Sequence, residues 1–174
     1  MNRQYSYQSP QLLRALQQSP SAAAEVTGSP DYPDIHGRVS FRQTSFGVLI
    51  SAEISGLPSS GSPCGGRVFA FHIHEGTSCT GNAGDPFSDT LTHYNPNRCK
   101  HPQHAGDLPP LWGNGGYAFS VFLTDRFSVD EVIGRTVIIH AEPDDFTTQP
   151  SGNAGKEIAF GVIKKFSIRQ ACQC

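Results

Sequence analysis

Six of the seven histidines in this chain lie between positions 72 and 140, and their spacing is typical of metal ligands. With one nearby carboxylate, the candidate set is His72, His74, His93, His101, His104, Asp107 and His140. Neutral imidazole binds copper and zinc well, whereas a carboxylate suits zinc better than copper. Six imidazoles and one carboxylate are enough for two metal ions only if one imidazole is shared. The pattern therefore predicts a two-metal site.

His72 and His74 are separated by one residue in a stretch that reads as a β-strand. Residues i and i+2 of a strand point to the same face, so both imidazoles can reach one ion while Ile73 points into the core. His140 ends a second apolar strand and is a candidate third ligand of that ion. The remaining ligands lie in a loop that can wrap a tetrahedral ion: His93, His101, His104 and Asp107.

The rest of the sequence predicts an all-β domain. The chain has 174 residues, with 18 Gly, 13 Pro and only 16% charged residues, which favours short strands and many turns. Alternating patterns predict strands at 37–43, 47–54, 68–74, 117–123, 135–140 and 157–165, the first two joined as a hairpin. A single helical turn is expected at 128–134, and 75–116 reads as a long loop that metal ligation would hold in place. This is the pattern of an antiparallel sandwich or barrel.

Three regions are expected along the chain. Residues 1–34 read as a flexible or loosely docked arm with one short helix over 10–18, residues 35–166 as the β-domain, and residues 167–174 as a tail. The formal net charge of −2 argues against a nucleic-acid partner. The sequence contains no run of about 18 apolar residues, so we expect no transmembrane helix. No secretory signal is visible either, so we expect a cytoplasmic protein.

Cysteine pairing is left open by the sequence. The five cysteines are Cys64, Cys79, Cys99, Cys172 and Cys174, and an odd number leaves at least one thiol unpaired within the chain. The sequence allows Cys79 to pair with Cys64 or Cys99 or to stay reduced.

Several segments resemble those of copper–zinc superoxide dismutases. They are Phe-His-Ile-His-Glu at 71–75, His-Tyr-Asn-Pro at 93–96, His-Ala-Gly-Asp-Leu at 104–108, Ile-Gly-Arg-Thr-Val-Ile-Ile-His at 133–140 and Ser-Gly-Asn-Ala-Gly at 151–155. Gly-Asp-Leu-Pro-Pro at 106–110 is similar to the bacterial branch, and the resemblance extends from about residue 36 to 166. It implies an eight-stranded Greek-key antiparallel barrel with long metal-binding loops.

The resemblance also implies a site and a reaction. The implied copper ligands are His72, His74, His93 and His140, and the implied zinc ligands are His93, His101, His104 and Asp107. Asp144 matches an aspartate that links ligands of the two metals. Superoxide would be converted to oxygen and hydrogen peroxide by ping-pong redox cycling of copper, with zinc structural. His93, as the shared imidazole, would take up and return a proton.

Two positions depart from the family pattern. Glu157 stands where the family has an arginine beside copper, so a reduced rate is expected unless Lys156 turns inward as a substitute. Phe160 stands where the family has a cysteine that pairs with the counterpart of Cys79.

These departures keep two alternatives open. One is a weakly catalytic or non-catalytic copper- and zinc-binding protein that buffers or delivers copper. The other is a zinc-only structural domain in which His72 and His74 are idle. Both a monomer and a homodimer fit the sequence.

Overall fold

The computed structural model describes residues 9–59, 67–82 and 87–167. Their elements in chain order are α1 (Ser9–Gln17), β1 (Ala22–Gly28), β2 (His36–Thr44), β3 (Gly47–Ser55), β4 (Arg67–Phe69), β5 (Phe71–His74), the 3-10 helix η1 (Ser88–Thr90), β6 (Leu111–Gly113), β7 (Ala118–Thr124), α2 (Val129–Val132), β8 (Thr136–His140), β9 (Glu157–Val162) and β10 (Lys164–Lys165). The expected hairpin, helical turn and strands are therefore present with shifted ends, except that the strands expected at 68–74 and 157–165 are each divided in two.

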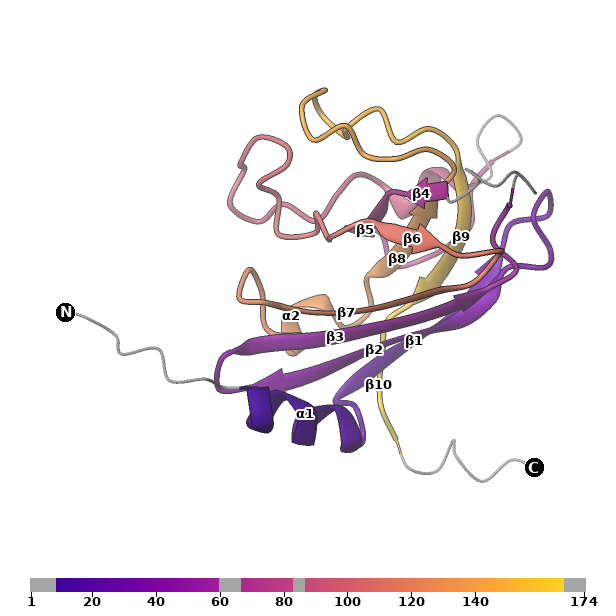
Figure 1. The fold of residues 1–174 in the computed structure, drawn as a ribbon. Coiled ribbons are helices and arrows are strands. Elements are labelled where there is room, and N and C mark those ends of the chain that lie inside the picture. The colour runs from indigo at the N-terminus through magenta and orange to yellow at the C-terminus, as the bar shows by residue number, and fades with distance from the viewer. Residues whose placement is uncertain (1–8, 60–66, 83–86, 168–174) are drawn as a thin grey trace.

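The strands form a curled antiparallel wall (Figure 1). Its hydrogen-bonded order is β5-β8-β9-β1-β2-β3-β7, with β10 also paired to β1, and β4 and β6 form a separate ribbon. That ribbon lies between the two ends of the sheet, because β4 runs into β5 and β6 turns directly into β7. When β4–β5 and β9–β10 are each counted as one bent strand, eight strands enclose the core. The expected eight-stranded Greek-key barrel is confirmed.

The core is filled by the inward-facing residues of these strands. Phe41 of β2, Ile50 and Ile54 of β3, and Phe71 and Ile73 of β5 are all 1% exposed or less. Each large buried side chain of this kind contributes roughly 1.5–3 kcal/mol relative to an exposed one. The barrel is thus a well-packed scaffold that supports the loops.

The strand expected at 68–74 is broken at Ala70, and in this respect the prediction is wrong. The amide of Ala70 donates to the carbonyl oxygen of Glu142, at 2.9 Å, and its carbonyl accepts from the amide of His140, also at 2.9 Å. The chain therefore changes partner at this residue, since β4 pairs with β6 whereas β5 pairs with β8. The change delivers His72 and His74 to the edge of the main sheet.

The prediction of a flexible or loosely docked arm over residues 1–34 is also wrong for residues 22–28. Strand β1 lies inside the sheet, between β9 and β2, and buries Ala22, Ala24 and Val26. These side chains alternate correctly for a strand, but two of them are alanines, so the apolar signal in the sequence is weak. Helix α1, expected at 10–18, lies against β2 and β3. The tail expected at 167–174 falls almost wholly outside the described residues.

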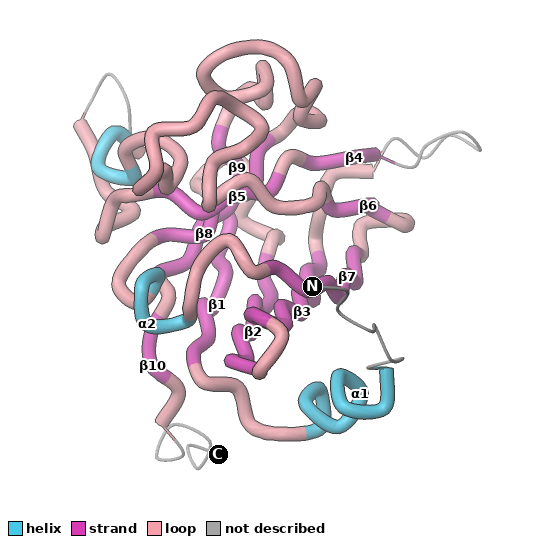
Figure 2. The backbone as a smooth tube through the Cα atoms, turned by 90° about the vertical axis from the view of Figure 1, so that its left-hand side faces the viewer, coloured by secondary structure: helices cyan, strands magenta, loops and turns pink. Residues whose placement is uncertain are grey.

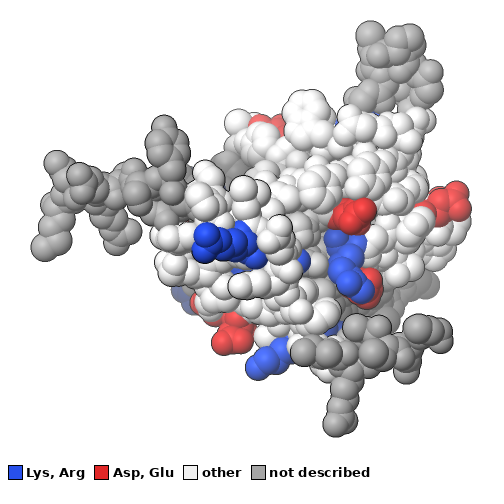
Figure 3. Space-filling view, turned by 60° about the horizontal axis from the view of Figure 1, so that its bottom comes forward, with Lys and Arg blue, Asp and Glu red and all other residues white. Residues whose placement is uncertain are grey.

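The long loops gather at one end of the barrel. In Figure 2 they lie together above β5 and β9, while α1 and α2 lie on the outside of the strands. Figure 3 presents a face on which charged side chains are few and lie among uncharged surface. Within the described residues, no helix has the length and apolarity needed to cross a membrane.

Candidate metal centre

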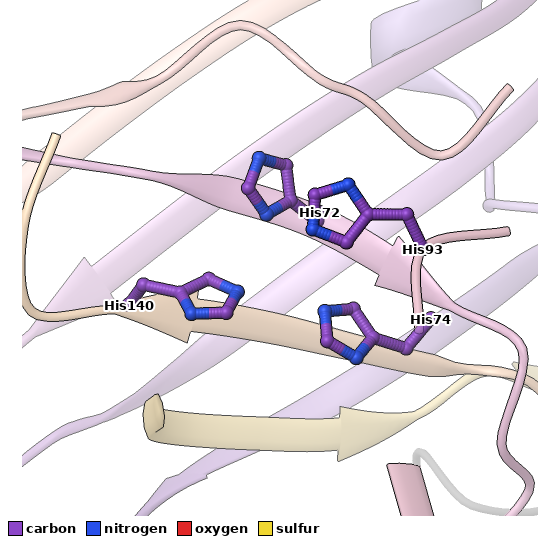
Figure 4. Close-up of side chains that lie close together, drawn as sticks. All are labelled: His72, His74, His93 and His140. Carbon is purple, nitrogen blue, oxygen red and sulfur yellow. The ribbon is translucent and has the colours of Figure 1, made fainter. Parts of the chain in front are cut away.

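Four histidines from three separate segments converge on one point. His72 and His74 come from β5, His140 is the last residue of β8, and His93 lies in a loop that forms a bridge with His74. Figure 4 shows their rings turned toward a common space. All four are 5% exposed or less. One nitrogen from each lies within 4.8 Å of the others, which suits a single metal ion.

A second group of four shares His93 with the first. Its members are His93, His101, His104 and Asp107, again with ligand atoms within 4.8 Å of one another. Oδ1 of Asp107 lies 2.7 Å from Nδ1 of His93 and 3.4 Å from Nδ1 of His104, and its Oδ2 lies 3.2 Å from Nδ1 of His101. Three imidazoles and one carboxylate are a common tetrahedral zinc set. The structure thus brings together all seven residues of the predicted set, with His93 between the two groups.

The buried nitrogens that lack partners indicate where metals belong. Among the described residues, five ring nitrogens are buried and make no hydrogen bond: Nδ1 of His72, Nε2 of His74, Nε2 of His93, Nδ1 of His101 and Nε2 of His140. A buried polar atom without a partner costs about 1–3 kcal/mol. Five in one place would be unfavourable in a protein that held no metal. Four of these nitrogens belong to the first group, so this donor set fits copper.

The opposite nitrogens of the same rings are held in place. Nδ1 of His74 lies 3.0 Å from the carbonyl oxygen of Leu91, and Nδ1 of His140 lies 3.2 Å from that of Gly155. A carbonyl only accepts, so each of these ring nitrogens must carry the proton. The lone pair of the other nitrogen is then directed at the shared space, as a metal ligand requires.

Asp144 links the two groups. One of its oxygens lies 2.9 Å from Nε2 of His72 and the other lies 2.9 Å from Nε2 of His101. Its side chain is only 2% exposed. A single carboxylate therefore orients one ring of each group. A substitution of Asp144 should disturb the geometry of both groups.

Burial sets the protonation states that metal binding needs. Burial lowers the pKa of His72 and His104, lowers that of His74 well below its usual value, and lowers that of His140 to about 3. Burial raises the pKa of Asp144, but hydrogen bonds from His72, the Phe146 amide and His101 outweigh this and bring it to about 2. At neutral pH these imidazoles are uncharged and the carboxylate is ionised. Those are the ligating forms.

Of the neighbouring residues Lys156 and Glu157, only Glu157 lies at the metal centre. Lys156 does not turn inward as the substitute considered for the family arginine, because its ammonium group pairs with Asp31 and both side chains are more than half exposed. Glu157, the first residue of β9, does lie beside the first group. Its Oε1 is 3.6 Å from Nδ1 of His74 and accepts a hydrogen bond of 3.0 Å from Oγ1 of Thr90.

The described cysteines are reduced. Cys79 and Cys99 are both free thiols, so the possible pair between them does not form. Cys64, Cys172 and Cys174 lie outside the described residues. Burial, and then the nearby Glu157, raises the pKa of Cys79 to about 11, so this group stays a neutral thiol at physiological pH.

Two side chains that sequence reasoning missed hold the loop of the second group. Nη1 of Arg126 donates to the carbonyl oxygens of Pro102, His104 and Asp107, at 3.1–3.2 Å. On the other side of the loop, Gln149 bonds both the amide and the carbonyl of His101, at 3.0 and 2.7 Å. Their partners are backbone atoms, which leave no signal in the sequence.

We expect Arg126→Gln to weaken zinc binding by about 10–100-fold, the usual effect of removing a partner that orients a metal ligand. The reason is that one guanidinium fixes the backbone of two residues of the second group. The measurement is chelator competition for zinc. Arg38→Gln is the matched control, since Arg38 is an exposed arginine paired with Glu25 on the barrel wall. Equal zinc affinities in the two variants would show that Arg126 does not position the loop.

Comparison with known proteins agrees with this geometry. The family profile described as Copper/zinc superoxide dismutase (SODC) matches residues 35–163. Superoxide dismutase [Cu-Zn] 1 of Aquifex aeolicus is 36% identical over 145 residues, which cover 74% of this chain and 79% of the relative. The Legionella pneumophila Superoxide dismutase [Cu-Zn] is 33% identical over 166 residues, covering 88% and 96%.

A solved structure has the same fold. The Cu/Zn superoxide dismutase from Brucella abortus superposes with a TM-score of 0.67 at 23% identity, covering 81% of this chain and 98% of that one. The long family match and the two relatives above 30% identity decide the assignment. This chain belongs to the copper/zinc superoxide dismutase family.

Proposed function

We propose that this protein is a superoxide dismutase with copper held by His72, His74, His93 and His140, and zinc held by His93, His101, His104 and Asp107. The observation that carries the proposal is the set of five buried imidazole nitrogens without hydrogen bonds, in two groups that share one ring. Copper, when bound, supplies the one-electron couple that disproportionates superoxide to oxygen and hydrogen peroxide, and zinc has a structural role.

His93 is the residue suited to move a proton. Its Nδ1 faces Asp107 in the second group, while its Nε2 lies with the first group and makes no hydrogen bond. With Nδ1 held on the zinc side, Nε2 is the atom at which a proton can be taken up and given back. His72, His74 and His140 keep their fixed orientations throughout, because their other nitrogens are held by Asp144 and by carbonyl oxygens.

The experiment that tests this proposal measures superoxide loss directly, on protein whose copper and zinc contents have been confirmed as stoichiometric. We expect a fast rate that is absent from the metal-free protein. A rate no better than that of buffer would mean that the metal site does not support dismutation.

Glu157 supports the proposal of a reduced rate. One unit charge about 6 Å from a bound anion changes its energy by roughly 3 kcal/mol at an effective dielectric constant of 20. Screening by salt and water reduces this effect. An acidic side chain beside His74 thus disfavours the approach of superoxide.

We therefore expect Glu157→Gln to raise kcat/KM about tenfold at low salt. The glutamine keeps an oxygen that can accept the hydrogen bond from Thr90, so the change removes charge with little change in shape. The gain should shrink as ionic strength rises. Glu25→Gln, at an exposed site on β1, removes the same charge elsewhere and is the control. If both variants change the rate equally, net charge and not the position of Glu157 is responsible.

The same carboxylate also favours a second candidate function, which is copper buffering or delivery with little turnover. A site that binds copper but repels the anion suits storage better than catalysis. Transfer of copper to a competing chelator within minutes, together with a negligible dismutation rate, would support this candidate. Copper retained for hours would argue against delivery.

A further inference from the structure

The segment 87–91 contacts both the barrel and His74, a member of the first group. The ring of Phe87 lies against that of Phe160 on β9, with centroids 5.1 Å apart and an angle of 48° between their planes. Thr90 donates to Glu157, also on β9, at 3.0 Å. Leu91 then offers its carbonyl oxygen to Nδ1 of His74, at 3.0 Å. Phe87 is 8% exposed and Thr90 only 1%, so these two side chains are shielded from water.

A β-bulge explains how β9 makes both contacts. His140 pairs with Glu157, but Ile139 pairs with Ala159, so Ile158 is an extra residue in the ladder. An extra residue reverses the alternation of side chains beyond it. Glu157 and Phe160 stand opposite His140 and Ile138, which share a face, and so they share a face themselves despite being three apart in sequence. Both are directed at the segment 87–91.

We propose that Phe87–Phe160 and Thr90–Glu157 form a non-covalent clasp that holds the segment 87–91 on the barrel and so orients His74. Phe160 and Thr90 are then positioning residues for copper. They act through the Leu91 carbonyl, which fixes the tautomer and direction of the His74 ring. The hydroxyl of Thr90 also lies 3.4 Å from the same Nδ1 of His74, so Thr90 supports this ring directly as well. The proposal rests on the proposed function only in naming copper as the metal of the first group.

The clasp does not depend on sulfur. Cys79, which lies in the same loop, is a free thiol. Aromatic pairs contribute about 0.5–1.5 kcal/mol beyond their buried area, and a buried hydrogen bond to a charged group about 1.5–3 kcal/mol. Neither contribution changes with the redox conditions. The geometry of His74 should therefore be the same whether thiols are reduced or oxidised.

The test measures copper affinity by chelator competition, and the copper(II) electron paramagnetic resonance spectrum, for Thr90→Val, Phe160→Ala and the double variant. We expect each single variant to weaken copper binding about tenfold and to change the spectrum, with zinc affinity unchanged. Because both residues act through one segment, the double variant should lose less than the product of the two effects. Unchanged zinc affinity also shows that a variant is folded.

Three controls make the test specific. Thr44→Val removes a hydroxyl from the hairpin of β2 and β3, and Phe119→Ala removes an exposed ring from β7, so both should match the parent protein. Cys79→Ala should match it too, because the clasp needs no thiol. Parental copper affinity and spectrum in both Thr90→Val and Phe160→Ala would overturn the proposal, and so would a loss in Cys79→Ala as large as in Phe160→Ala. None of these readouts requires turnover, so a failure of dismutation would leave the test intact.

Discussion

Replacing His140 by alanine is expected to lower the rate of superoxide loss at least 100-fold and to weaken copper binding, while zinc remains bound. His140 closes the first group from the end of β8, and its Nε2 is one of the buried nitrogens without a hydrogen bond. Alanine leaves three ligands and a cavity that water can enter, which removes the restraint on copper geometry. His140 is not a member of the second group, so the affinity of that group for zinc should be unchanged.

The measurement pairs metal analysis with the superoxide rate, on His140→Ala loaded in the same way as the parent protein. The control is His36→Ala. His36 is the one histidine outside both groups, exposed at the start of β2 with its Nδ1 bonded to the carbonyl oxygen of Asp34. Unchanged metal content in both His140→Ala and His72→Ala would indicate a zinc-only structural domain. A full rate in His140→Ala would contradict the proposed function.

The predictable part of the site depends on local chain geometry. His72 and His74 flank Ile73, and alternation along a strand is enough to place both imidazoles on one side and the isoleucine in the core, as observed. The ligand types then restrict the metals, because imidazole and carboxylate suit copper and zinc. The barrel class likewise follows from short alternating runs separated by turns.

The unpredictable part depends on contacts between distant segments. Strand β1 was missed because Ala22 and Ala24 are too small to give a strong apolar signal, although the sheet buries them completely. Lys156 is a candidate for the site because it adjoins Glu157, yet its charge is paired with Asp31, 125 positions away in the sequence. The hydrogen bonds of Arg126 end on carbonyl oxygens, which every residue has. Local patterns contain no information of this kind.

The second large effect is expected at Gly152. Its φ of +66° is a left-handed conformation, and a Cβ at this position would lie 2.0 Å from Oδ1 of Asp144 and 2.7 Å from Nε2 of His101. These two atoms form the hydrogen bond that links Asp144 to the second group. An alanine side chain therefore cannot be accommodated unless Asp144 or His101 moves. Since Asp144 also holds His72, the disturbance should reach both groups.

We expect Gly152→Ala to lower the free energy of unfolding by about 2–5 kcal/mol, from left-handed strain of about 1–2 kcal/mol and overpacking of about 1–3 kcal/mol. Zinc affinity should fall about 10–100-fold, because the partner that orients His101 is displaced. Denaturant unfolding of the metal-free protein and chelator competition measure the two effects separately.

The variant Gly115→Ala separates the effect of backbone strain from that of steric overlap with Asp144. Gly115 has a similar φ of +61°, but a Cβ there would meet nothing within 4 Å. It should therefore cost only the strain of about 1–2 kcal/mol and leave zinc affinity unchanged. The difference between the two variants is the effect of displacing Asp144. If Gly152→Ala loses no more stability than Gly115→Ala and keeps its zinc, Asp144 can move without loss, and its bonds to His72 and His101 do not hold the two groups together.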